Sequence, residues 1–310
     1  MLTPLVLAAG CDTPPPASRV GGITWVGYEP LFLARELGHF DPATLRLVEM
    51  PSNSAALMAL ATGDLEAAAL TLDECLLARE GGLDVRAILV FDYSSGADVV
   101  MARPEVRKLG DVRGKRVGVE DTAAAALVFA KLLERADLSP SEVVKVRLTA
   151  DRQVRAYGAG EVDVLVSWEP IATQLETLGA HRLYDSSDFP GLIVDVLVAR
   201  KDALDRAPEH FRALLAGYFR ALDYLAASPE DAYQQMASRL GMQPDAVRLA
   251  QRGVQRLDRA ANRAWLDGGA PALIQSAAAV GAVMMKTRLL QRPPALDQLI
   301  DARFLPGASG

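Results

Sequence analysis

Cysteine and histidine are scarce in this sequence. The chain has 310 residues with 2 cysteines and 3 histidines, and no CxxC spacing occurs. A metal site or a Cys/His nucleophile therefore has little material, and we expect neither a bound metal nor a cofactor. Cys75 lies in a helix-like stretch, TLDECLLARE, where a buried structural thiol is the simpler interpretation.

Long apolar runs and basic runs are also absent. No stretch reaches the roughly 18 apolar residues that suggest a membrane-spanning helix. The net charge is −6 and no segment is rich in Lys and Arg, so we expect no nucleic-acid partner. Hydrophobic residues make up 50% of the chain and charged residues 23%, which is usual for a packed globular protein. This length leaves room for about two domains.

The N-terminal segment, MLTPLVLAAGCDTPPPASRVGG, is apolar up to Gly10 and rich in Pro, Ser and Gly after Cys11. Small residues before a single cysteine and a flexible tether after it resemble the lipobox of bacterial lipoproteins. The segment departs from that pattern at Ala8, where Leu is usual, and it has no basic region before the apolar part. We expect residues 1–22 to be a truncated lipoprotein signal and tether, with lipidation at Cys11 and a membrane anchor. Coincidence is the alternative.

Strand and helix signals alternate from Val20 to about residue 200. Runs such as TLRLVEM, LEAAAL and VRAILVF predict strands, and EPLFLARELGHF, closed by Gly38, predicts a helix. Ser54 is expected to cap the next helix. This alternation is typical of an α/β fold with largely parallel sheets covered by helices. Beyond residue 200 the pattern is almost wholly helical and predicts no strand, so those helices must bury their apolar faces on sheets formed earlier in the chain.

This distribution predicts two lobes with a cleft between them. Residues 23–98 and 200–310 would form lobe I, and residues 99–199 would form lobe II, inserted between them. Strands near 97–103 and 193–200 would carry the chain across and back as hinges. Two sequential α/β domains are the alternative.

Several stretches in consistent order resemble one family of transport proteins. They lie between about positions 22 and 205 and read WVGYEPLFLARELGHF, SNSAALMALATGDLEAAALTLDE, DYSSGADVVMARPEVRKLGDVRGKRVGVE, AYGAGEVDVLVSWEP and VLVARKDAL. As a set they are similar to the periplasmic solute-binding proteins of ABC importers, in the SsuA/THI5-like (NMT1, nitrate/sulfonate/taurine) group. The resemblance implies a type II-like periplasmic-binding-protein fold with mostly parallel sheets and a ligand in the interlobe cleft. It also implies a monomeric, extracytoplasmic protein that delivers its ligand to a membrane permease and its ATPase.

Ligands of open parallel sheets bind beyond the carboxyl ends of the strands, where loops and helix N-termini converge. Members of the family use these same loops. The positions selected by the rule are Trp25, Gly27, Tyr28, Asn53, Ser54, Asp73, Asp92, Tyr93 and Asp98 in or next to the first lobe, Glu120, Thr122, Ala123, Trp168 and Glu169 in the second, and Asp195 on the returning strand.

These candidates also have structural interpretations that remain open. The alternative for Trp25 and Trp168 is core packing, for Tyr28 and Tyr93 a surface position, and for Thr122 a helix cap alone. A further candidate, Asp195, stands in an apolar strand and needs a partner, which a ligand or a neighbouring side chain could supply.

The stretch FDYSSGADVV, at positions 91–100, is expected to be a turn at the point where the chain crosses between the lobes. Asp92 and Tyr93 would then contact the ligand, and residues 96–99 would pivot as the lobes close.

The candidate positions carry many carboxylates and no Lys or Arg, which favours one sign of ligand. A charge-assisted hydrogen bond contributes about 1.5–3 kcal/mol, whereas a helix N-terminus stabilises an anion by only about 0.3–1 kcal/mol. We therefore expect a neutral or cationic nitrogen compound, such as a pyrimidine-like vitamin precursor, held by carboxylates and aromatic rings. A sulfonate, nitrate or taurine-type anion is the alternative.

Three function classes fit the sequence. The first is a binding protein that closes by hinge motion and performs no chemistry. The second is an enzyme on the same fold, but the cysteine-rich motif of the related pyrimidine synthase is missing. The third is a ligand-sensing lobe that works with a signalling partner. We expect the first.

Overall fold

The first lobe is built on a sheet whose strands come from distant parts of the chain. The computed structural model describes residues 15–307, so Cys11 lies outside the described residues. The strands of this sheet are β1 (Ser18–Gly22), β2 (Leu45–Glu49), β3 (Ala67–Thr71), β4 (Val85–Ser94), β10 (Val194–Arg200) and β11 (Val254–Arg256). Their order is β11-β4-β10-β3-β1-β2. β1 is parallel to β2 and β3, whereas β10 runs antiparallel between β3 and β4.

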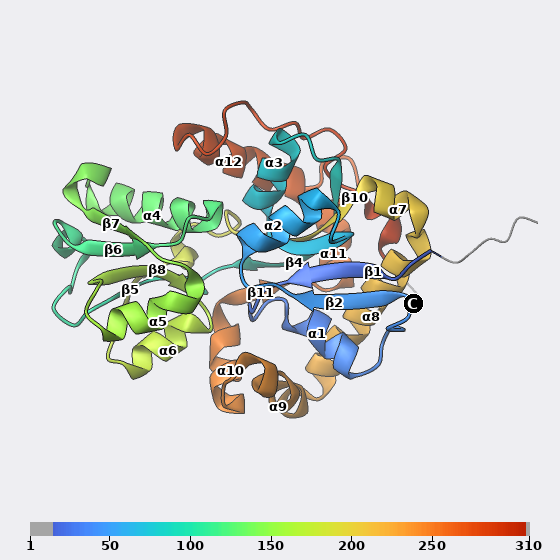
Figure 1. Ribbon diagram of the computed structural model, residues 1–310, viewed down its shortest axis with the longest axis horizontal. Helices are drawn as coiled ribbons and strands as arrows, with labels where there is room; N and C mark the ends of the chain where they lie inside the picture. Colours follow the sequence, from blue (N-terminus) through green and yellow to red (C-terminus); the bar gives the residue numbers. More distant parts are fainter. Residues whose placement is uncertain (1–14, 308–310) are drawn as a thin grey trace, which may run out of the picture.

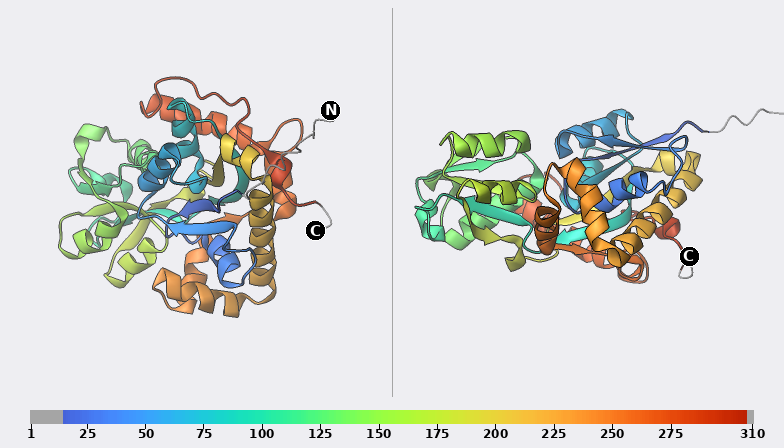
Figure 2. Two further views of the ribbon diagram at one scale, coloured as in Figure 1. Left: turned by 45° about the vertical axis from the view of Figure 1, so that its right-hand side comes forward. Right: turned by 90° about the horizontal axis from the view of Figure 1, so that it is seen from below.

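Helices cover both faces of this sheet (Figure 1). One face carries α1 (Glu29–Glu36), α8 (Pro208–Ala227), α9 (Pro229–Leu240) and α10 (Pro244–Ala250). The other carries α2 (Asn53–Thr62), α3 (Leu72–Glu80), α11 (Arg259–Leu266) and α12 (Ala272–Lys286). Figure 2 shows the C-terminal helices, in orange and red, wrapped around this lobe. Cys75, on α3, is fully buried, as the sequence predicts.

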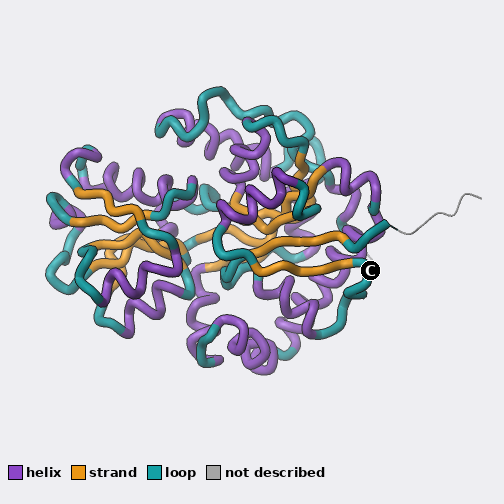
Figure 3. The backbone as a smooth tube through the Cα atoms, viewed as in Figure 1, coloured by secondary structure: helices purple, strands orange, loops and turns teal. Residues whose placement is uncertain are grey.

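The second lobe repeats this arrangement on a smaller scale. Its strands are β5 (Asp98–Ala102), β6 (Arg116–Val119), β7 (Val144–Arg147), β8 (Val164–Trp168) and β9 (His181–Asp185), in the order β7-β6-β8-β5-β9. β6 is parallel to β7 and β8, and β5 runs antiparallel between β8 and β9. α4 (Ala123–Ala136) packs on one face, and α5 (Ala150–Gly158) and α6 (Ile171–Thr177) on the other. Figure 3 shows both sheets between layers of helix, which confirms the two-lobe α/β fold class.

The chain passes between the lobes in two short segments. Residues 95–97 join β4 to β5, and residues 186–193 join β9 to β10. The sequence predicts that lobe II reaches residue 199, but residues 194–199 lie in β10, a central strand of the first sheet. The two strands expected to act as hinges, β5 and β10, are therefore interior strands of different sheets. Both are apolar because each is buried on two faces.

Two local predictions are wrong. Ser52, not Ser54, caps α2: the Ser52 hydroxyl accepts the N–H of Ala55 at 3.1 Å, and Ser54 lies inside the helix. The C-terminal third is not purely helical either, because residues 254–256 form β11 and pair with the end of β4. A segment of 3 residues has no periodicity that a sequence pattern can detect.

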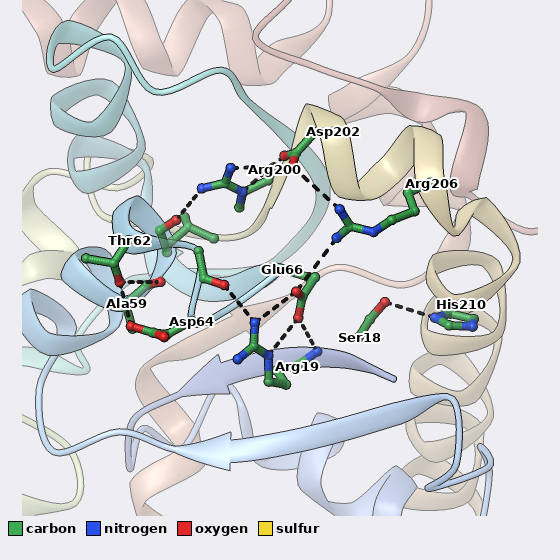
Figure 4. Close-up of polar contacts among 12 residues, drawn as sticks. Ser18, Arg19, Ala59, Thr62, Asp64, Glu66, Arg200, Asp202, Arg206 and His210 are labelled. Atoms are coloured by element: carbon green, nitrogen blue, oxygen red, sulfur yellow. Dashed lines mark hydrogen bonds and ion pairs between the residues drawn. The ribbon is translucent and has the colours of Figure 1, made fainter. Parts of the chain in front are cut away.

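Charged side chains tie together the amino-terminal edge of the first sheet (Figure 4). Glu66, just before β3, pairs with Arg19 of β1 at 3.0 Å and with Arg206 of α7 (Lys201–Arg206) at 3.7 Å. Asp202 pairs with Arg206 at 3.8 Å and with Arg200 at 3.0 Å. These basic side chains lie at the edge opposite the carboxyl ends of the parallel strands.

Within residues 15–307, no helix combines the length and the apolar character that crossing a bilayer requires.

Candidate functional site

A cavity of about 380 Å³ lies between the two lobes, at the carboxyl ends of the parallel strands. Its first-lobe wall consists of Ile23, Thr24, Trp25, Tyr28, Met50, Pro51, Ser52, Asn53, Thr71, Ile193, Asp195 and Leu240. Its second-lobe wall consists of Asp98, Glu120, Thr122, Ala124, Ala150, Asp151, Val154, Trp168, Pro170, Ile171 and Gln174. A cavity of this size, lined by both lobes, can enclose a small molecule.

Several helices begin at the cavity wall. Tyr28, Ser52, Thr71 and Thr122 are the N-caps of α1, α2, α3 and α4, and Ala150 is the first residue of α5. The partial positive charge of a helix N-terminus favours groups that accept hydrogen bonds from backbone N–H. The helix N-termini therefore offer backbone N–H donors to the cavity. The side chains of the wall determine which solute groups can bind there.

The candidates from the sequence divide into two groups. Those in the cavity wall are Trp25, Tyr28, Asn53, Asp98, Glu120, Thr122, Trp168 and Asp195. Those outside the wall are Gly27, Ser54, Asp73, Asp92, Tyr93, Ala123 and Glu169.

Gly27 and Asp92 lie behind the wall and position Trp25. A Cβ added to Gly27 would overlap with Asp92 Oδ2 and Trp25 Nε1, and it would lie 2.8 Å from Asp92 Cγ. Asp92 is fully buried, and neither of its carboxylate oxygens has a hydrogen-bond partner among the described residues. Trp25, itself 4% exposed, thus rests on a glycine and a carboxylate.

The remaining outside residues are directed elsewhere. The ring of Tyr93 stacks on Trp265, with 5.8 Å between ring centroids and 14° between planes, so it packs against α11. Glu169 accepts hydrogen bonds from Thr173 and pairs with Arg182 in a separate groove on the lobe boundary. Ser54 is exposed on α2, and Ala123 and Asp73 are buried in the first turns of α4 and α3.

Tyr28 and Asp195 form the best-defined polar contact of the wall. The Tyr28 hydroxyl donates to Asp195 Oδ1, and the Tyr28 ring packs on Phe91 at 5.1 Å. Tyr28 is 1% exposed, so the alternative that it is a surface residue is wrong. Asp195 pairs across the strands with Asp92, which brings a second carboxyl group close behind it.

Asp98 begins β5 and faces the same end of the cavity. Its backbone N–H donates to Ser94 Oγ at 3.0 Å, and the Ser94 hydroxyl also contacts Ser186 Oγ at 2.7 Å. Asp98 is 7% exposed, and its Oδ2 has no hydrogen-bond partner among the described residues. The end of β4 and the segment that begins at Ser186 therefore fix Asp98 in the cavity wall, where its Oδ2 can still accept a hydrogen bond.

Burial raises the pKa of several of these carboxyl groups. It raises the pKa of Asp98 to about 7 and that of Glu120 to about 7. It also raises the pKa of Asp92 to about 7, although the guanidinium of Arg256 acts in the opposite direction. The pKa of Asp195 is raised by burial and by the charge of Asp92, whereas the hydrogen bond from Tyr28 lowers it. Near neutral pH this group of acids can exchange protons.

The ligand-free protein is expected to lose stability as the pH rises through this range. The folded-state pKa values of Asp92 and Asp98 lie near 7, above the ordinary value of 3.8. The folded state therefore binds more protons than the unfolded state between about pH 4 and pH 7, and the free energy of unfolding falls across that window. A tenfold difference in proton affinity between the two states corresponds to about 1.4 kcal/mol, which sets the order of the effect. Denaturant unfolding at pH 5 and pH 8 measures it, and Asp98→Asn should give a shallower fall. An equal fall in the free energy of unfolding from pH 5 to pH 8 in the two proteins would contradict the prediction.

The wall also contains residues that the sequence did not single out. Thr71 ends β3, and Ala150 and Asp151 follow β7, so the rule of carboxyl ends covers these positions too. Ile193 lies at the same edge because it precedes the antiparallel strand β10. Leu240 is different, because it comes from the end of α9 and no local pattern marks it.

Similarity to known proteins identifies the family of this chain. A family model described as NMT1/THI5 like matches residues 25–232, about two thirds of the chain. The chain belongs to the NMT1/THI5-like family. The matched range contains the cavity wall apart from Ile23, Thr24 and Leu240, so the cavity lies almost wholly within the family region.

Curated relatives are similar to part of this chain. A putative binding protein of Brucella abortus is 23% identical over 176 residues, which are 56% of this chain and 54% of the relative. The chain thus spans about half the length of the curated relatives it matches.

Two solved structures share the fold. The alkanesulfonate-binding protein SsuA of Xanthomonas axonopodis pv. citri, bound to MOPS, aligns with a TM-score of 0.77 at 18% identity, covering 94% of this chain and 99% of that one. The desulfurization enzyme DSZB aligns with a TM-score of 0.65 at 20% identity, covering 93% and 97%. The fold of this chain is therefore shared by a binding protein and by an enzyme.

Proposed function

We propose that this protein is the solute-binding component of an ABC-type importer and performs no chemistry. It captures a small solute between its lobes and delivers it to a membrane permease with its ATPase. The observation that carries the proposal is the cavity walled by both lobes, at the carboxyl ends of both sheets. Family membership supports the same role.

The similar proteins favour binding over catalysis. SsuA is an alkanesulfonate-binding protein, and the Brucella relatives are named as putative binding proteins. DSZB is an enzyme on this same fold. The cavity wall of the described residues contains no cysteine and no histidine, so it offers no Cys/His pair for nucleophilic catalysis.

The solute we propose is a neutral or cationic nitrogen compound with a ring, such as an aminopyrimidine. The wall carries Asp98, Glu120, Asp151 and Asp195, and no Lys, Arg or His lines it within the described part of the chain. Carboxyl groups accept from N–H donors, and Trp25 and Trp168 offer aromatic surface. An anion such as an alkanesulfonate would have to bind helix N-termini and neutral donors such as Asn53 and Thr122, next to these acids and without a cationic partner.

Hinge closure and an extracytoplasmic location complete the proposal. Residues 95–97 and 186–193 are the only links between the sheets in the described chain, so they are where the lobes would rotate. Cys11 would carry a lipid anchor, and monomeric protein would be found in the membrane fraction outside the cytoplasm. Fractionation of cells that express the native protein tests the location.

A panel of solutes tests the ligand class. Isothermal titration calorimetry with aminopyrimidines, aliphatic amines, taurine, alkanesulfonates and nitrate is expected to give the lowest Kd for an aminopyrimidine or an amine. Mass spectrometry of solute co-purified with the protein provides an independent measurement. Small-angle scattering should show a smaller radius of gyration when the tightest solute is added, because the lobes close on it.

The outcomes separate the ligand class from the function. Tight binding of taurine or an alkanesulfonate would overturn the proposed ligand but leave the importer role in place. Turnover of a bound solute into a new product would overturn the role of a binding protein.

A further inference from the structure

Two buried carboxyl groups from different lobes line the same cavity. Asp195, on β10, is 3% exposed and accepts the Tyr28 hydroxyl with Oδ1. Asp98, on β5, is 7% exposed, lies in the wall and has no hydrogen-bond partner for Oδ2 among the described residues. The two are close enough for the charge of Asp98 to act on Asp195. A buried carboxylate oxygen without a partner is costly, so a donor from the cavity would be stabilising.

The surroundings supply more negative than positive charge. Asp92 lies behind Asp195 on β4, and Asp73 acts on Asp98 from the first turn of α3. Arg256 of β11 acts on Asp92. The other ionisable groups packed around these carboxyls are Tyr28 on the α1 side, Glu74 beside Asp73 on α3, and Glu120 on the second-lobe wall.

A metal ion does not fit this group of acids. Among residues 15–307, no three or more His, Cys, Asp or Glu side chains are placed to hold one. The wall around Asp98 and Asp195 is instead partly aromatic and aliphatic, with Trp25, Trp168 and Ile193. Such a wall suits an organic cation, whose charged nitrogen binds the carboxylates while its carbon framework packs on the rings.

We propose that Asp98 and Asp195 form a subsite for a positively charged nitrogen of the solute, an ammonium or amidinium group. The inference rests on the proposed function, because it names the chemical group that the interlobe cavity recognises. Since Asp195 belongs to the first lobe and Asp98 to the second, the cationic group joins the two lobes when it binds. Recognition of the positive charge and closure of the two lobes then occur in the same step.

Binding of the cation also displaces protons. Without solute, burial and the charges of neighbouring carboxylates raise the pKa of both groups, that of Asp98 to about 7. A bound cation stabilises their ionised forms, so protons leave as the solute enters, and affinity rises with pH between about 6 and 8.

The test uses three benzene derivatives that differ only in the substituent. Benzamidine is cationic, benzamide is its neutral analogue and benzenesulfonate is anionic. Calorimetry at pH 8 is expected to give benzamidine a Kd about 10- to 100-fold lower than benzamide, the size of a charge-assisted hydrogen bond. Titration in buffers of different ionisation enthalpy should show net proton release with benzamidine at pH 7 and none with benzamide.

Asn substitutions keep the shape of the site and remove the charge. Asp98→Asn and Asp195→Asn are each expected to abolish the preference for benzamidine over benzamide and to reduce the proton release. Asp121→Asn is the matched control, because Asp121 is exposed next to the wall residue Glu120 but lies outside the cavity wall. It should change the Kd of benzamidine by less than about threefold, in line with the weak coupling of exposed charges. Thermal unfolding of each variant verifies that it is folded.

Each outcome has one meaning. Equal or tighter binding of benzamide or benzenesulfonate, no binding of benzamidine, or an unchanged preference in both Asn variants would overturn the subsite. The importer role would survive all three, because a different solute could still close the lobes. The importer role fails separately, if no solute of the wider panel binds and none co-purifies.

Discussion

Gly27→Ala is expected to weaken solute binding by about tenfold or more and to destabilise the fold by about 1–3 kcal/mol. The added Cβ would overlap with Asp92 Oδ2 and Trp25 Nε1. Asp92 is fully buried and Trp25 is about as close to the added atom, so the carboxylate and the indole ring must both shift. Because Trp25 lines the cavity, its displacement removes aromatic surface from the solute. Calorimetry with the tightest solute and denaturant unfolding measure the two effects.

Gly110→Ala is the control for this substitution. An added Cβ at Gly110 meets no atom within 4 Å, and its backbone is not left-handed. This variant should bind solute with the affinity of the unmodified protein. If Gly27→Ala bound equally well, Trp25 would not depend on the packing of Gly27 against Asp92.

The positions of the site could be predicted from the sequence because they depend on topology. Strands that run in the same direction bring their carboxyl ends to one edge, and the alternating pattern was enough to locate those ends. Trp25, Asp98, Glu120 and Trp168 were found in this way, and all four lie in the cavity wall. Contact with a solute is a separate property, which the substitutions test.

The direction of each side chain could not be predicted in the same way. Neighbouring residues of a strand point to opposite faces, so Asp92 and Tyr93 cannot both face one cavity. Tyr93 packs on Trp265 and Asp92 supports the site from behind. The stretch FDYSSGADVV is thus the end of β4, a short crossing and the start of β5, and only its Asp98 lines the cavity.

Residues that reach the site through tertiary packing leave no local signal. Leu240 arrives from α9 and Arg256 from β11, more than a hundred residues after the loops they approach. The helical pattern of the C-terminal third indicates that these helices must pack on the first sheet. It does not indicate which of their residues contact the lobe boundary.

Gly253→Ala is expected to weaken solute binding although residue 253 is outside the cavity wall. Gly253 packs directly on the crossing segment: its carbonyl accepts the N–H of Ser95 at 2.8 Å. An added Cβ would overlap with the backbone of Gly96 and Ala97 and lie 2.8 Å from the Ala97 Cα. Main-chain atoms cannot rotate away as a side chain can, so the crossing segment itself must shift. That shift moves Asp98, the first residue of β5, relative to Asp195.

We expect a loss of affinity of about tenfold and a destabilisation near ~3 kcal/mol, at the upper end of the range for overpacking. Gly269→Ala, where an added Cβ meets nothing within 4 Å, is the control. Calorimetry and denaturant unfolding measure both quantities, and small-angle scattering with and without solute measures closure. Unchanged affinity together with normal closure would show that the packing of Gly253 does not constrain the crossing segment. A loss of affinity without a loss of stability would show that the substitution changes the alignment of the two lobes. In that case the fold accommodates the added methyl group, and the altered distance between Asp98 and Asp195 accounts for the weaker binding.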